Sequence, residues 1–167
     1  AIRRQRQMWI RDKWNSVKMG PKKDIIGALK KELEKEGFVF GLSTHKAENA
    51  WFFNGGMDFP SDVQDTTLSL YGRRYKNEKY TDDFAREWLT HTYELINKYK
   101  PKLIWFDWTV NNCVLMPYFN KFMAYYYNNA LDWGEGVVVN TKQGYPTNIQ
   151  VWDMERGKSG KMMQFPW

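Results

Sequence analysis

Residues 102–108 read Lys-Leu-Ile-Trp-Phe-Asp-Trp, an apolar run that follows Pro101 and contains one carboxylate, Asp107. An apolar run of this length without polar alternation predicts a strand that is buried on both faces. Such strands belong to parallel sheets that helices cover, and ligands of these sheets gather at the carboxyl ends of the strands. The stretch therefore predicts an α/β protein. Asp107 would lie in its functional site or, more simply, cap the turn that follows.

Segments on both sides of this strand alternate between helical and strand patterns. The predicted helices cover residues 22–36, 82–100 and 117–130, and the further strands cover residues 38–42, 137–140 and 149–152. The order α-β-loop-α-β-α-β-β predicts a partial (β/α)8 TIM-like barrel, with about four strands and intervening helices. A doubly wound open sheet is the alternative, although no Gly-x-Gly-x-x-Gly fingerprint follows any of these strands.

The chain between the first predicted strand and the second predicted helix is long. Residues 43–80 are polar and aromatic, and a loop of that length in a compact domain is usually functional. Thr81 has the character of an N-cap, and Asp82 and Asp83 place negative charge in the first turn, where it suits the helix dipole. The loop is therefore expected to end at this cap.

Composition narrows the class of function. The chain has 167 residues, a length that suits one domain. Its net charge of +6 makes nucleic acid a candidate partner. Nucleic-acid binding is disfavoured because the excess positive charge lies near the two ends of the chain. The single cysteine, Cys113, excludes an internal disulfide and a cysteine metal cluster. No apolar stretch is long enough to span a membrane, so no membrane partner is expected.

Polar residues follow the predicted strands, where a parallel sheet would gather them on one face. They include His45, Glu48, Asp107, Lys142 and Glu155. Two carboxylates in aromatic surroundings are what glycoside hydrolysis requires, one as nucleophile and one as proton donor. The aromatic residues near these positions are Trp51, Trp105, Trp108 and Trp152.

Simpler interpretations remain open for these residues. Glu155 could pair with Arg156 at the surface, and His45 alone is more often a structural histidine. A metal site made of His45, Glu48 and Asp107 is disfavoured because these ligands lack a tight spacing. We therefore expect neither a metal nor a cofactor.

Several phrases of the sequence together resemble the α-L-fucosidases of glycoside hydrolase family 29. They occur in the same order as in that family and cover the chain from about residue 14 to its end. The matching phrases are residues 14–24, 41–49, 70–72, 95–107, 137–140 and 155–157.

The resemblance implies a role for each candidate residue. Asp107 aligns with the nucleophile of a retaining, double-displacement mechanism. Glu155 is the best candidate for the acid/base, although in some members that residue follows a tryptophan placed like Trp167. Lys142 falls where many members carry an arginine near the nucleophile, and lysine keeps the charge without the bidentate fork. The remaining expected sugar-binding residues are His45, Glu48, Trp51 and Trp108.

The resemblance also implies a larger protein. Residues 1–167 would form part of a catalytic barrel, without its N- and C-terminal parts or the usual β-sandwich. The whole protein would bind fucosylated oligosaccharides or glycoconjugates and be secreted, periplasmic or lysosomal; the sequence carries no signal of oligomeric state. This half barrel alone should be poorly stable and inactive, because it leaves sheet edges and apolar surface uncovered. Another barrel glycosidase and a non-catalytic carbohydrate-binding relative are the alternatives.

Overall fold

The described part of the protein is a parallel sheet with helices. The computed structural model describes residues 15–65, 80–107, 112–142 and 149–153, without the side chain of Trp152. Its helices are α2 (Ile25–Lys35), α3 (Asp82–Tyr99) and α4 (Met116–Trp133), and its strands are β1 (Gly41–Thr44), β2 (Leu103–Phe106), β3 (Val138–Thr141) and β4 (Val151–Trp152). Short 3-10 turns follow β1 as η1 (Lys46–Ala50), η2 (Asn54–Met57) and η3 (Asp62–Gln64).

The four strands lie in the sheet in the order in which they occur along the chain, β1-β2-β3-β4. Every neighbouring pair is parallel. Doubly wound sheets reverse their strand order at a switch point, and these four strands show no such reversal. The predicted α/β class with a parallel sheet is therefore confirmed.

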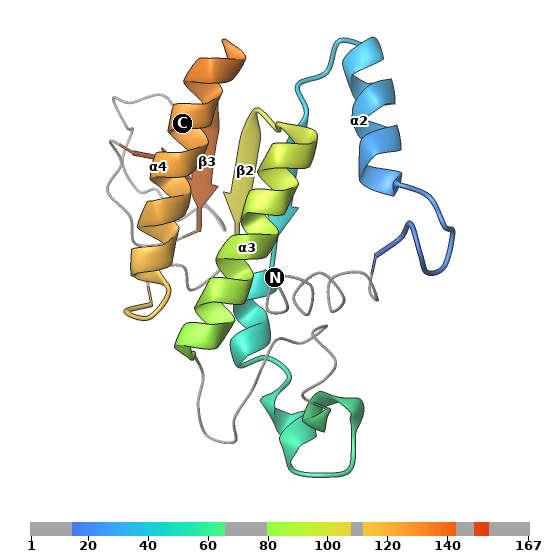
Figure 1. Cartoon of the computed structure of the whole chain (residues 1–167), viewed down its shortest axis with the longest axis vertical. Coiled ribbons are helices and arrows are strands. Elements are labelled where there is room, and N and C mark those ends of the chain that lie inside the picture. Colours follow the sequence, from blue (N-terminus) through green and yellow to red (C-terminus); the bar gives the residue numbers. More distant parts are fainter. Residues whose placement is uncertain (1–14, 66–79, 108–111, 143–148, 154–167) are drawn as a thin grey trace, which may run out of the picture.

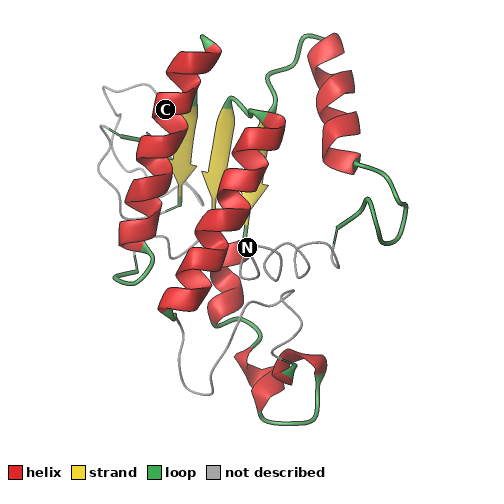
Figure 2. Cartoon of the chain, viewed as in Figure 1, coloured by secondary structure: helices red, strands yellow, loops and turns green. Residues whose placement is uncertain are grey.

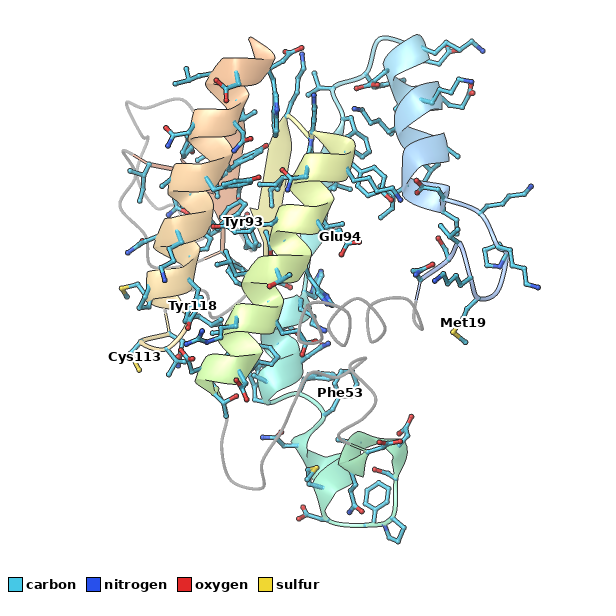
Figure 3. All side chains as sticks on the ribbon, in the orientation of Figure 1. Met19, Phe53, Tyr93, Glu94, Cys113 and Tyr118 are labelled. Atoms are coloured by element: carbon cyan, nitrogen blue, oxygen red, sulfur yellow. The ribbon has the colours of Figure 1, made fainter. Side chains whose placement is uncertain are left out.

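Helices α3 and α4 lie side by side across one face of the sheet, as Figures 1 and 2 show. Their apolar faces meet the strands in a core of aromatic rings. Phe106 of β2 lies 5.6 Å from the ring of Trp88 on α3 and 5.0 Å from that of Phe122 on α4. Tyr93 of α3 lies between the two helices, as Figure 3 shows. Its ring centre is 4.2 Å from that of Tyr125 on α4.

The ends of α3 follow from its sequence. Thr81 caps the first turn by accepting a hydrogen bond from the Phe84 backbone N–H at 3.2 Å, as its residue type predicts. The last turn closes at Lys100, which adopts a left-handed conformation with φ of 43°. Pro101 then prevents the helix from continuing, so that β2 can begin at Leu103.

Helix α2 stands apart from this core at one side of the sheet (Figure 1). None of its residues is buried, and the apolar residues predicted to form its inner face remain partly exposed. Leu29, for example, is 57% exposed. The apolar spacing correctly predicts the helix, but in the described structure its apolar face has little cover.

The first strand begins later than predicted. Residues 38–42 were expected to form it, yet Phe38 and Val39 are 64% and 72% exposed and β1 starts at Gly41. The reason is a Schellman motif at the end of α2, in which the Phe38 N–H donates to the Leu33 carbonyl at 2.9 Å. Gly37 provides the positive φ that this motif needs, so Phe38 belongs to the helix cap and the strand begins after it.

Candidate active site

One row of side chains forms where the four strands end. Thr44, Phe106, Thr141 and Trp152 are paired across the sheet, and the next residues along the chain are His45, Asp107, Lys142 and Asp153. Phe106 and Thr141 are buried on the helix-covered face. Because successive side chains of a strand point to opposite faces, the next residues belong to the other face. This end of the sheet therefore gathers charged groups away from the helices.

Asp107 lies between two nitrogen atoms of this row. Its Oδ2 is 3.0 Å from Nδ1 of His45, and its Oδ1 is 2.8 Å from Nζ of Lys142. The side chain of Asp107 is only 7% exposed and that of Lys142 only 12%. Water therefore screens the attraction between the Lys142 ammonium group and the Asp107 carboxylate only weakly.

A second carboxyl group, that of Glu48, lies beside this pair. The turn η1 places Glu48 three residues after His45, and its Oε1 is 3.5 Å from His45 Nδ1. Burial raises the pKa of the Glu48 carboxyl above its ordinary value, and the charge of Asp107 raises it further. Two carboxyl groups that share one site cannot both ionise freely, so Glu48 keeps its proton more readily than a solvated glutamate.

His45, Glu48 and Asp107 are close enough to one another to be considered as metal ligands. Their potential ligand atoms all lie within 4.8 Å of one another. The Lys142 ammonium already lies 2.8 Å from Asp107, however, and it would repel a cation bound there. The electrostatics of the cluster therefore suit a neutral or partly positive reacting group better than a metal ion.

Trp105 lies two residues before Asp107 and therefore belongs to the same face of the sheet. Its ring meets the His45 ring edge-on at 5.7 Å, and the Lys142 ammonium lies 5.8 Å from its centre. Its Nε1–H donates to Oδ2 of Asp153 at 2.8 Å. Sequence reasoning did not select Asp153, although it directly follows β4 as Asp107 follows β2.

The structure brings together His45, Glu48, Asp107 and Lys142 from the residues selected in the sequence. Trp51 lies at the end of η1, where its ring packs edge-on against Phe52. Trp108 and Glu155 lie outside the described residues. The roles of all these residues remain predictions.

Comparison with known proteins gives the family. A sequence model of the alpha-L-fucosidase family matches residues 7–167. This chain belongs to the alpha-L-fucosidase family. The family resemblance drawn from the sequence phrases is therefore confirmed.

Relatives within the alpha-L-fucosidase family are considerably longer than this chain. The chain is 32% identical over 136 residues to the tissue alpha-L-fucosidases of Bos taurus and Homo sapiens, which covers 78% of this chain and 24% of each relative. The alpha-L-fucosidase of Branchiostoma floridae is 29% identical over 70% of this chain and 23% of its own length. The chain thus spans about a quarter of these relatives. Among the described residues, no helix has the length and apolarity to cross a membrane.

Proposed function

We propose that the whole protein is a retaining α-L-fucosidase, which cleaves terminal α-L-fucose from glycans or glycoconjugates. One observation carries the proposal: in a chain of the alpha-L-fucosidase family, Asp107 is buried at the end of β2 between His45 and Lys142. A carboxylate that is fixed in position and shielded from water can act as a glycosidase nucleophile. The tissue enzymes among the relatives support the further proposal of a secreted or lysosomal location.

The proposed domain is part of a (β/α)8 barrel. Four parallel strands in chain order, with α3 and α4 on one face, are what a segment of such a barrel contains. Within the described residues β1 pairs only with β2, so its other edge is available to a preceding strand. The charged row would then face the mouth of the barrel, where the active sites of this fold lie.

The mechanism that we propose is a double displacement. An oxygen of Asp107 attacks the anomeric carbon and forms a glycosyl ester, while the bond to the leaving oxygen breaks and that oxygen takes a proton from the acid. His45 and Lys142 hold the carboxylate in position, and each oxygen of Asp107 keeps a second lone pair for the attack. Water then attacks the same anomeric carbon and gives its proton to the acid/base residue, while the bond to the Asp107 oxygen breaks. Fucose leaves with retained configuration and the Asp107 carboxylate is regenerated.

The nucleophile assignment is tested by Asp107→Gly in the whole protein, with an aryl α-L-fucoside as substrate. We expect turnover to fall at least about a thousand-fold, because the covalent step is lost. Asp24→Asn, which removes a carboxylate from the α2 cap, is the matched control and should leave turnover within about two-fold. Turnover near that of the wild type in Asp107→Gly would contradict the assignment.

Glu155 is proposed as the acid/base residue on the resemblance alone. Glu155→Ala should lose activity mainly on substrates with poor leaving groups, which need protonation, and azide should restore part of the turnover. If Glu155→Ala behaves as the wild type, the acid/base is another residue. A whole wild-type protein that binds fucose and does not hydrolyse fucosides would instead indicate a non-catalytic carbohydrate-binding protein.

A further inference from the structure

Asp153 follows β4 and completes the row of side chains that contains Asp107. The strand register, continued by one residue, aligns Asp153 with Lys142, which follows β3, and with Asp107, which follows β2. The carboxylate of Asp153 accepts a hydrogen bond from the Trp105 indole at 2.8 Å. This bond connects two strands that are not neighbours in the sheet, because β3 lies between β2 and β4.

The Trp105 indole contacts both nitrogen partners of Asp107. Its ring centre is 5.7 Å from that of His45 and 5.8 Å from Nζ of Lys142. The torsion that turns an indole about its Cβ–Cγ bond is soft, so packing alone restrains the ring loosely. A hydrogen bond from Nε1–H to a carboxylate oxygen at 2.8 Å is directional, and it selects one orientation of the ring.

We propose that Asp153 is a positioning residue of the nucleophile site. Its carboxylate fixes the indole of Trp105, and the indole in turn keeps His45 and Lys142 in place against Asp107. These contacts do not depend on the reaction, whereas the effect of Asp153 on turnover rests on the proposed function. In this proposal Asp153 acts as a hydrogen-bond acceptor for Trp105, and not through its negative charge.

The first test measures the assigned imidazole NMR signals of His45 and His91 in the whole protein. His91 lies on α3 and serves as an internal control for His45. Asp153→Ala should move the His45 signals and leave those of His91 in place. Asp153→Asn keeps an acceptor oxygen and should leave the His45 signals close to their wild-type positions.

The variants also provide the results that would overturn the proposal. Unchanged His45 signals in Asp153→Ala, or the same displacement in Asp153→Asn, would exclude positioning through the acceptor. If Asp153→Ala shifts His91 as well, the fold itself has changed, and Asp153→Leu, which has a similar volume and no acceptor, replaces it. Displacement of His45 alone in Asp153→Leu supports the proposal, and any other result contradicts it.

The second test is a double-mutant cycle on hydrolysis by the whole protein. Asp153→Ala should lower kcat roughly ten-fold with KM within about two-fold, because a misplaced reacting group slows the chemical step. Trp105→Phe, which keeps a ring and lacks the N–H, should cost about as much, and the double variant should cost little more than either. Asp132→Ala, at an exposed position of α4, is the control and should leave kcat unchanged.

Independent, additive losses in the cycle would contradict the proposal, because Asp153 would then act without Trp105. A wild-type protein that does not hydrolyse fucosides would refute the proposed function instead. In that case the NMR test still decides whether Asp153 positions the site.

Discussion

Asp24 and Asp107 both pair with a lysine, but the two carboxylates have different surroundings. Asp24 precedes α2 and accepts hydrogen bonds from the Gly27 N–H at 3.0 Å and the Tyr99 hydroxyl at 2.7 Å, and Lys98 Nζ is 2.9 Å away. The Gly27 N–H, followed by Lys98 and Tyr99, lowers the pKa of Asp24 to about 2. Each of these three neighbours stabilises the ionised form of the partly exposed Asp24 carboxylate.

Asp107 is buried and has another carboxyl group, Glu48, beside it. Among the described residues, neither Oδ1 of Asp107 nor the buried Oε1 of Glu48 has a partner with hydrogen-bond geometry, although Lys142 Nζ lies 2.8 Å from Oδ1. The described part of the chain therefore places two acidic groups together without donors that satisfy both. The comparison teaches that the contacts of Asp24 join α2 to α3 favourably. The Asp107 cluster instead has a locally unfavourable free energy, as reactive sites often do.

The largest expected difference between the two regions concerns their lysines. Lys142→Met should lower the free energy of unfolding by about 3 kcal/mol, because it leaves a buried carboxylate without its cation. Urea denaturation of the whole protein at pH 7, followed by tryptophan fluorescence, measures this loss.

Lys98→Met is the matched control on the Asp24 side. The Lys98 and Asp24 side chains are 48% and 36% exposed, so water screens their attraction and the loss should be at most about 1 kcal/mol. Equal losses in the two variants would break the comparison, because burial would then not distinguish the two pairs.

Removal of the Asp24 carboxylate should have the next largest effect. Asp24→Ala should cost about 1–2 kcal/mol of unfolding free energy at pH 7, since α2 loses its N-cap and its bond to Tyr99. A carboxyl group whose pKa is lowered by folding stabilises the fold above its ordinary pKa, and this contribution is lost as the pH falls towards the folded value. The difference between wild type and variant should therefore shrink from about pH 4 to about pH 2. A difference that stays constant down to pH 2 would contradict the assigned cause.

The smallest expected effect is the pH dependence that comes from Glu48, and it has the opposite sign. Because folding raises the pKa of Glu48, the folded state binds more protons than the unfolded state, and stability falls as the pH rises above about 4.5. Glu48→Gln should remove this decline and stabilise the chain at pH 7 by less than about 1 kcal/mol. Denaturation between pH 4 and pH 8 measures how the free energy of unfolding changes with pH. The same pH dependence in Glu48→Gln and the wild type would show that Glu48 does not cause the decline.

The sequence predicts the long helices of this protein better than its strands. Thr81 and Pro117 mark the beginnings of α3 and α4, and the apolar spacing of each helix agrees with its buried face. The strands have only two to four residues, which is too few for periodicity to fix their ends. Phe38 has strand propensity, but its backbone N–H bonds to the cap of α2 instead.

The candidate site was predictable to the extent that it depends on chain order. If the strands are parallel and adjacent, the residues that follow them must meet, which brings Asp107 and Lys142 together. The proximity of Glu48 depends on η1, a 3-10 turn that no apolar pattern indicates. Asp153 was overlooked because β4 has two residues and its importance lies in a contact with Trp105, two strands away.

The shared register of the row also bears on how this region can change in evolution. Each of its four side chains faces the site because a fixed number of paired residues precedes it. Substitutions at one position can be absorbed singly, but deletion of one residue between Leu103 and Phe106 would reverse the alternation of side chains in β2. Asp107 would then turn into the helix layer and an aromatic ring would turn out of it, so a single deletion would remove the site and part of the core together.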